Sequence, residues 1–134
     1  MRRFHDAQDG VFDTALAELE AGRKRSHWMW FVFPQIAGLG RSETARRYAI
    51  RDADEARAYL ADPVLRDRLA RAAAALTTHA GTPAEAILGG IDAMKLRSSM
   101  TLFDAVDPDG PWRAVLDAFF DAPCAATLAR LEAG

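Results

Sequence analysis

One segment, residues 62–81 with the sequence DPVLRDRLARAAAALTTHAG, constrains the fold of this chain more strongly than any other. Asp62 is an expected N-cap, and Pro63 follows at the first helical position, where its missing N–H costs no hydrogen bond. Gly81 provides a stop signal. Apolar residues recur between them at helical spacing: Leu65, Leu69 and Leu76. The segment therefore predicts a long amphipathic helix whose apolar stripe needs other elements to cover it.

Similar signals occur along most of the chain. Ser42 and Asp52 stand where N-caps are expected, and Thr82 and Asp92 are expected to open two further helices. Helical spacing dominates between these signals, and no long linker or fixed repeat interrupts it. We therefore predict an all-α, compact multihelical fold, with residues 1–134 forming a single domain.

The aromatic-rich segment Trp28–Phe33 admits two interpretations. Trp, Phe and Val favour strands, but no second segment offers a partner, and a lone strand leaves its backbone unpaired. We expect a short buried helix that ends at Pro34, with most of its residues in the core. The segment is also the longest uncharged apolar run, and it is too short to cross a bilayer.

Composition excludes several classes of protein. Half of the residues are hydrophobic and 27% are charged, as is typical of a globular domain. Cys124 is the single cysteine, which excludes an internal disulfide, and no zinc-ligand spacing is present. The start of the chain lacks the apolar stretch of a secretion signal. We expect a cytoplasmic protein with no metal or other cofactor and no membrane association.

The formal net charge of −2 is unevenly distributed. Residues 1–51 contain nine Lys or Arg and six Asp or Glu, whereas residues 52–134 contain eight and thirteen. The first part of the chain is therefore suited to attracting an anionic ligand. The excess is too small for a dedicated DNA-binding protein, which normally carries a broad basic surface.

The segment GRKRSHWMWFVFPQ, residues 22–35, places a basic cluster directly before the apolar run. Lys24 and Arg25 could simply offset the dipole of the preceding helix at a solvated helix end. However, Ser26 and His27 lie between these cations and the aromatic residues, and a cation beside a ring suits a nucleotide's phosphate and base. The candidate ligand-binding residues here are Lys24, Arg25, Ser26, Trp28, Trp30 and Gln35.

The segment GLGRS, residues 38–42, is a second candidate anion site. Gly38 and Gly40 let the backbone approach a ligand, and Arg41 and the helix starting at Ser42 supply positive potential. The alternative is a glycine turn followed by an ordinary cap. No lysine follows the last glycine, so a Walker loop is excluded.

The segment DAMKLRSSMTLF, residues 92–103, is the third candidate. On a helix, Asp92, Lys95 and Ser99 share a face. The alternative to an anion pocket is an Asp92–Lys95 surface pair, with the serines bonded to backbone carbonyls. The candidate residues are Lys95, Arg97, Ser98 and Ser99.

No standard catalytic motif is present. If there is a reaction, His27 is the candidate general acid or base, and Lys95 would stabilise developing negative charge. Ser98 and Ser99 are candidate nucleophiles or positioning residues. A structural histidine is the commoner alternative, so the sequence leaves open whether the protein is an enzyme.

Four segments carry a family resemblance, in order from about Phe4 to Leu131: FHDAQ, ALAELEAGRKRSHWMWFVFPQIAGLGRSETARRYAI, EARAYLADPVLRDRL and DAMKLRSSMTLFDAV. They resemble the family named domain of unknown function 1810. This resemblance implies a small, chiefly bacterial helical protein and no reaction. Some members carry the label calpastatin, which we do not transfer, because such an inhibitor is disordered whereas this chain is rich in core-forming residues.

The resemblance also implies positions. LGGID and APCAAT depart from the family pattern and weaken the last third of the chain as part of a site. Gln8 and Tyr48 join the candidate ligand-binding residues on this ground alone. The family's signature polar residues fall on Gln8, Lys24, Ser26, His27, Gln35, Ser42, Tyr48, Lys95, Ser98 and Ser99.

Two main hypotheses follow. In the first, the three basic segments converge on a phosphorylated, nucleotide-like small molecule, which the protein binds and, in a version left open, hydrolyses. In the second, Trp28–Phe33 is the docking surface of a protein-interaction or homodimerisation module without catalysis, and an exposed apolar patch is expected there. In a third hypothesis, the polar signature residues only stabilise helix ends, so that their mutation causes large losses of stability.

Overall fold

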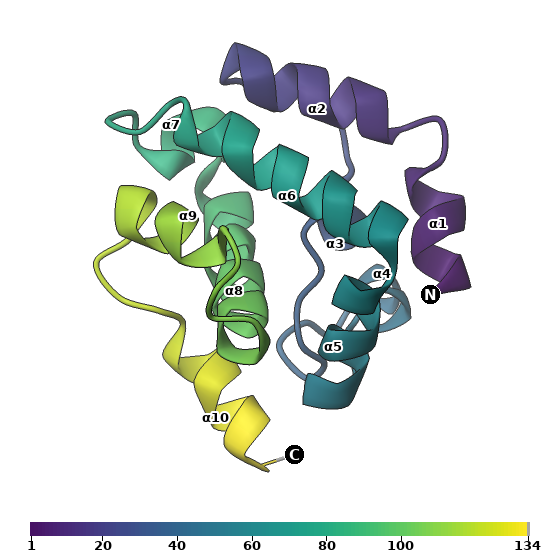
Figure 1. Cartoon of the computed structure of the whole chain (residues 1–134). Coiled ribbons are helices and arrows are strands. Elements are labelled where there is room, and N and C mark those ends of the chain that lie inside the picture. Colours follow the sequence, from purple (N-terminus) through teal and green to yellow (C-terminus); the bar gives the residue numbers. More distant parts are fainter. Residues whose placement is uncertain (134) are drawn as a thin grey trace.

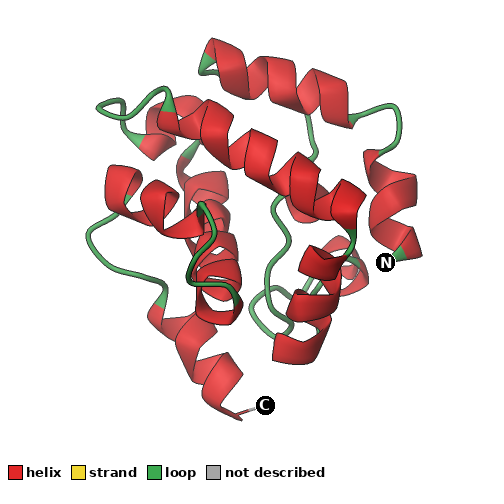
Figure 2. Cartoon of the chain, in the orientation of Figure 1, coloured by secondary structure: helices red, strands yellow, loops and turns green. Residues whose placement is uncertain are grey.

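Residues 1–133 are described by the computed structural model, and within this range they form helices and no strand (Figures 1 and 2). This confirms the all-α fold that helical spacing predicts. The helices are α1 (Arg2–Gln8), α2 (Phe12–Ala21), α3 (Met29–Val32), α4 (Glu43–Arg47), α5 (Ala53–Ala61), α6 (Pro63–Thr77), α7 (Ala84–Leu88), α8 (Gly90–Val106), α9 (Trp112–Phe119) and α10 (Ala125–Ala133).

Ser42, Asp52 and Asp62 are confirmed as side-chain caps of α4, α5 and α6. The Asp62 carboxylate accepts hydrogen bonds from the backbone N–H groups of Val64 and Leu65, at 3.0 and 3.1 Å. Each cap satisfies N–H groups that have no partner inside the helix. Local sequence therefore determines where these three helices begin.

Two predicted helix starts are wrong. Thr82 makes no capping bond, because Pro83 occupies the N-cap position of α7. α8 begins at Gly90, two residues before Asp92, because Gly89 adopts a φ of +88° between α7 and α8. A positive φ is accessible to glycine at little cost, so one residue ends α7 and opens α8.

The segment Trp28–Phe33 is confirmed as a short helix, α3, that stops before Pro34. Most of the segment is core, as the sequence indicates, and Trp30 and Phe31 remain partly exposed. The buried members are Trp28, Met29, Val32 and Phe33. Burial thus anchors the helix on one side and leaves the Trp30 indole near the surface.

The chain after α3 pairs with the residues that follow α4. The Ala37 N–H donates to the Ile50 carbonyl at 2.7 Å, and the Ile50 N–H donates to the Gln35 carbonyl at 2.8 Å. These bonds form an isolated parallel bridge between Ile36 and Ile50, which are both buried. The bridge holds residues 35–40 against the core beside α3.

α8 passes through the centre of the molecule and packs against α5, α7, α9 and α10 (Figure 1). Phe103 of α8 lies between two buried aromatic rings, with centroids 5.3 Å from Tyr59 and 6.0 Å from Trp112. Aromatic burial of this kind supplies much of a core's hydrophobic stabilisation. It fixes the face of α8 that carries Asp92 and Lys95.

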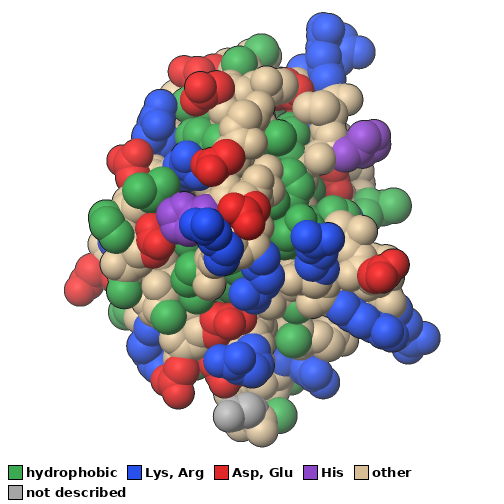
Figure 3. Space-filling view, turned by 90° about the vertical axis from the view of Figure 1, so that its right-hand side faces the viewer, with side chains coloured by type: hydrophobic (Ala, Val, Ile, Leu, Met, Phe, Trp, Pro, Cys, Tyr) green, Lys and Arg blue, Asp and Glu red, His purple; other side chains and the backbone are tan. Residues whose placement is uncertain are grey.

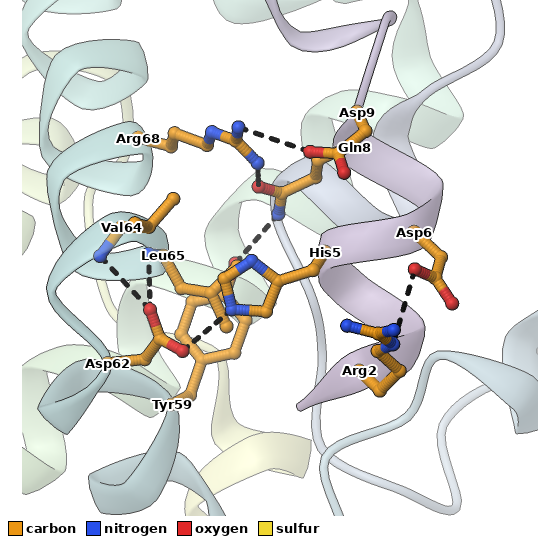
Figure 4. A network of polar contacts seen from close by, with 10 residues as sticks. All are labelled: Arg2, His5, Asp6, Gln8, Asp9, Tyr59, Asp62, Val64, Leu65 and Arg68. Atoms are coloured by element: carbon orange, nitrogen blue, oxygen red, sulfur yellow. Dashed lines mark hydrogen bonds and ion pairs between the residues drawn. The ribbon is translucent and has the colours of Figure 1, made fainter.

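A polar network joins α1 to the junction between α5 and α6 (Figure 4). His5 Nε2 lies 2.7 Å from Asp62 Oδ2, and the other oxygen of this carboxylate caps α6. The hydrogen bond from His5, together with those from Leu65 and Val64, lowers the pKa of Asp62 below its ordinary value. One carboxylate therefore ties α1 to the start of α6.

Gln8 lies inside this network, with 1% of its surface exposed (Figure 4). Its Nε2 donates to the Phe31 carbonyl at 2.7 Å and to the Tyr59 hydroxyl at 3.1 Å, and its Oε1 accepts from Arg68 at 3.3 Å. Burial raises the pKa of the Tyr59 hydroxyl, so this group stays protonated. Gln8 thus belongs to the core rather than to a ligand site.

Charged side chains of both signs are interspersed over the face shown in Figure 3. Most of the ion pairs within residues 1–133 involve partly or fully exposed groups, which contribute little stability each. Within the same range, no helix has the length and apolar character needed to span a membrane.

Candidate ligand-binding site

Trp30 of α3 lines three hollows, which adjoin one another because they share residues. The apolar hollow, of about 330 Å³, is closed by Leu39, Ile91, Met94, Cys124 and Ala126. The arginine hollow, of about 130 Å³, is lined by Gln35, Arg46 and Tyr48 among others. The lysine hollow, of about 80 Å³, is lined by Lys24, His27, Trp28, Met29, Asp92 and Lys95.

The lysine hollow brings Lys24 together with Asp92 and Lys95, which are far from it in the sequence. Asp92 lies 2.9 Å from Lys24 Nζ and 3.3 Å from Lys95 Nζ. Lys95 Nζ is also 3.5 Å from the centroid of the Trp30 ring, and Lys24 Nζ is 5.1 Å from that of Trp28. Two ammonium groups face one carboxylate, so the group keeps a net positive charge beside an aromatic surface. The Asp92–Lys95 pair that the sequence allows as an alternative is present, but it is not a surface pair, since the two side chains are 17% and 18% exposed and belong to this larger group.

Glu18 of α2 organises the loop that carries the lysine hollow. Its carboxylate accepts hydrogen bonds from the backbone N–H groups of Arg25 and Ser26, the Ser26 hydroxyl and the Trp28 indole, at 2.6 to 3.0 Å. Burial acts to raise the pKa of Glu18, but these hydrogen bonds to the charged form together lower it to about 2. Arg25 and Ser26 therefore serve the loop's own structure, and neither side chain lines a hollow.

His27 is exposed and lies at the edge of the lysine hollow. Within residues 1–133 its ring makes no hydrogen bond to another side chain. A general base is normally oriented by such a partner. His27 thus lines the lysine hollow, and no side chain within residues 1–133 is placed to orient it as a general base.

The two glycines of the GLGRS segment differ, since Gly38 accommodates a protein group rather than a ligand. Gly38 has a φ of +96°, and the Arg130 guanidinium occupies the space that a Cβ would need. Arg130 Nε donates to the Ala37 carbonyl at 3.2 Å. Gly40 does line the apolar and arginine hollows. Arg41 and Ser42 are exposed and line none of the three, and the Ser42 hydroxyl caps α4.

The KLRSS segment mainly holds α10 in place. Arg97 donates to the carbonyls of Ala122 and Pro123, at 2.7 and 3.0 Å. The Ser98 hydroxyl is 2.8 Å from that of Thr127, although Ser98 also lines the apolar hollow. Ser99 is fully buried, lines none of the hollows, and its hydroxyl has no partner within residues 1–133. Of this segment, Lys95 and Ser98 therefore reach the site, whereas Arg97 and Ser99 do not.

Thr101, which the sequence did not single out, completes the attachment of α10. Its hydroxyl donates to the Arg97 carbonyl at 2.7 Å and accepts from the Cys124 N–H at 2.9 Å. The only buried residue of α10 is Thr127, so α10 is held largely by such polar bonds. Because Cys124 and Ala126 close the apolar hollow, this attachment determines the shape of the site.

We expect Thr101→Val to loosen α10 while the rest of the fold persists. The variant keeps the shape of the side chain but leaves the partly buried Cys124 N–H without its acceptor, so the global loss should be about 1 kcal/mol. Local opening should raise the labelling rate of Cys124 by a thiol reagent several-fold. Thr77→Val is the matched control, since Thr77 makes only a local bond to the Ala74 carbonyl. Unchanged Cys124 reactivity in Thr101→Val would contradict this role.

Several residues of the site carry no sequence signal. Glu18 and Arg46 look like ordinary solvated helix charges, and Ile91 and Met94 look like the apolar stripe of α8. In fact Ile91 and Met94 are 75% and 73% exposed, and they form one rim of the apolar hollow. Within residues 1–133, no group of three or more His, Cys, Asp or Glu is placed to hold a metal ion.

The fold and the site define a small helical protein with a lysine-covered indole beside an apolar hollow. The chain belongs to the family described as protein of unknown function DUF1810, whose family model matches residues 1–131. It is similar to the conserved hypothetical protein Rv1873 from Mycobacterium tuberculosis, known from a crystal structure at 1.38 Å. The two share 42% sequence identity over 98% of this chain and 95% of that chain, with a TM-score of 0.94. A comparison with curated proteins gives no match.

Proposed function

We propose that this protein binds a phosphorylated, nucleotide-like small molecule at the Trp30 site. The supporting observation is the position of Lys95, whose Nζ lies 3.5 Å from the centroid of a partly exposed indole that also lines the apolar hollow. A ring in the apolar hollow would contact Trp30 and the Ile91–Met94 rim. A phosphate joined to that ring through a sugar would reach Lys95, with Lys24 behind it.

The surroundings of Lys95 strengthen such a contact. The Lys95 side chain is only 17% exposed, so its charge is less screened than that of a surface lysine. A charge-assisted hydrogen bond of this kind contributes about 1.5–3 kcal/mol, and a base stacked on an aromatic side chain about 1–3 kcal/mol. Together they amount to at most about 6 kcal/mol, which corresponds to a dissociation constant of tens of micromolar or weaker. Asp92 orients both lysines and lowers the repulsion between them.

The proposal is one of binding without catalysis. The Ser98 hydroxyl is engaged with Thr127, and within residues 1–133 His27 has no partner to orient it. Ser99 lies outside the hollows. We further propose a cytoplasmic location, because the single Cys124 is a half-buried free thiol of the kind that a reducing compartment preserves.

Lys95→Ala should weaken binding about tenfold or more, while the thermal midpoint stays nearly unchanged. Binding is measured by tryptophan fluorescence and calorimetry with a panel of nucleotides and sugar phosphates. Arg71→Ala is the control, since it removes one exposed positive charge on α6, outside all three hollows. Saturable quenching in wild type that Lys95→Ala leaves unaltered would reject the assigned role of Lys95.

A protein-interaction module remains the second candidate, and one observation favours it. Ile91 and Met94 are highly exposed and lie beside Trp30, so they form an apolar cluster on the surface. Such clusters are typical of protein-interaction surfaces, whereas single exposed apolar side chains are common on any protein. Absence of any response to the panel, together with a size in chromatography that increases with concentration, would support this candidate, including a homodimer.

A further inference from the structure

Three polar side chains of the arginine hollow have no bonding partner within residues 1–133. These are the Gln35 amide, the Arg46 guanidinium and the Tyr48 hydroxyl. The neighbouring Arg51, by contrast, pairs with Asp52 and Glu55. Convergent polar groups with free bonding capacity around a partly open hollow are typical of a ligand site. Together they offer a cation, an amide and a hydroxyl.

The arginine hollow adjoins the apolar hollow, since the two share part of their walls. Trp30, Gln35 and Gly40 line both. A Cβ at Gly40 would lie 2.6 Å from the Cβ of Ala45, so only glycine lets the loop pass this close to α4. A molecule that contacts Trp30 in the apolar hollow can therefore extend past the indole into the arginine hollow.

The walls of the arginine hollow are held in place by the rest of the fold. The bridge between Ile36 and Ile50 fixes one side, and the Ser42 cap fixes the start of α4. The Tyr48 ring packs at 5.4 Å from Phe31 and 6.1 Å from Phe4, measured between centroids. Little ordering is thus needed on binding, which favours affinity.

The charges of the hollows indicate two separate anionic groups. In the lysine hollow, Asp92 leaves a net charge of about +1 for one phosphate. Arg46 adds a positive charge that no carboxylate within 4 Å offsets in residues 1–133, and its planar donors match phosphate oxygens. Tyr48 and Gln35 supply neutral donors beside it.

We propose that the arginine hollow is a second phosphate subsite, so that the ligand class is a nucleoside carrying two separate phosphate groups. This inference rests on the proposed function. One phosphate contacts Lys95, the ring of the nucleoside lies against Trp30, and the second phosphate contacts Arg46 and the Tyr48 hydroxyl.

The test compares the four ribonucleoside 5′-monophosphates with the corresponding 3′,5′-bisphosphates by calorimetry. For the base that binds, the bisphosphate should bind about tenfold more tightly. Arg46→Ala should remove this advantage and leave the monophosphate affinity unchanged, whereas Lys95→Ala should weaken both ligands. Arg41→Ala is the matched control, because Arg41 is an equally exposed arginine of the same region that lines no hollow.

The outcomes separate the two proposals. Equal affinities for the monophosphate and the bisphosphate, or an advantage that survives Arg46→Ala, would overturn the second subsite and leave the first intact. An equal loss of bisphosphate affinity in Arg41→Ala and Arg46→Ala would indicate only general electrostatic attraction, and it would also overturn the second subsite. Lack of binding by every member of both series would overturn the proposed function, and the second subsite with it.

Discussion

Glu18→Ala is expected to lower the free energy of unfolding by about 2–4 kcal/mol. The Glu18 carboxylate accepts four hydrogen bonds, and one of the donors is the indole N–H of the fully buried Trp28. Hydrogen bonds to a charged group are each worth more than neutral ones, and the variant leaves a buried donor without a partner. The loop that carries Lys24 should loosen at the same time. Urea unfolding followed by tryptophan fluorescence measures the change.

The control for Glu18→Ala is Glu20→Ala, on the same helix, since Glu20 is exposed and its carboxylate makes no hydrogen bond within residues 1–133. Glu20→Ala should change stability by less than about 0.5 kcal/mol. Similar losses in the two variants would contradict the role of Glu18.

The pH dependence of stability gives Glu18 a second readout. Its folded-state pKa of about 2 lies below the ordinary value of 4.5, so its contribution is complete above pH 4.5 and is lost as the pH falls toward 2. Glu18→Gln keeps the shape of the side chain and removes the charge. Its stability should therefore fall less steeply than that of wild type in this window.

Gln8→Ala is expected to cost about 2–3 kcal/mol of stability. The change leaves the Phe31 carbonyl and the Tyr59 hydroxyl without their amide partner in the core (Figure 4). It also opens a small cavity beneath α1. The Phe31 carbonyl belongs to the helix that carries Trp30, so the indole should gain mobility, which time-resolved anisotropy measures.

Asp9→Ala is the comparison for Gln8→Ala, because Asp9 meets the same Arg68 only through an exposed pair at 3.3 Å. Such pairs contribute about 0–1 kcal/mol. If Gln8→Ala unfolds at the same denaturant concentration as Asp9→Ala, the network does not carry the stability assigned to it.

The helices could be predicted largely from sequence because their signals are local. Asp62 with Pro63 marks the start of α6 within two residues, and Gly22, with a φ of +75°, ends α2. The prediction of Thr82 as the cap of α7 is wrong because Pro83 lies at the N-cap itself rather than in the first turn. A cap residue and its helix are neighbours along the chain, so no tertiary information is needed to recognise most of them.

The site could be predicted only in part. Lys24 and Trp30 could be singled out because a cation next to an aromatic run is unusual in a plain helix end, and Lys95 because it shares a helix face with Asp92 and Ser99. Arg97, Ser99 and Ser42 are of the residue types found in phosphate sites, but they serve the fold. Arg97 bonds to the chain just before α10, Ser99 is buried in the core, and Ser42 caps α4. Residue type does not distinguish a hydroxyl that binds a ligand from one that holds two helices together.

The sequence by itself determined that this chain is helical, where most helices begin and that Trp28–Phe33 is mainly core. Only the tertiary structure decided that Lys24 and Lys95 share Asp92, that Glu18 holds the loop that carries Lys24, and that Arg46 and Trp30 line a common hollow. The reason is physical. Helix signals act between residues a few positions apart, whereas a site depends on contacts between segments that only packing of the core brings together.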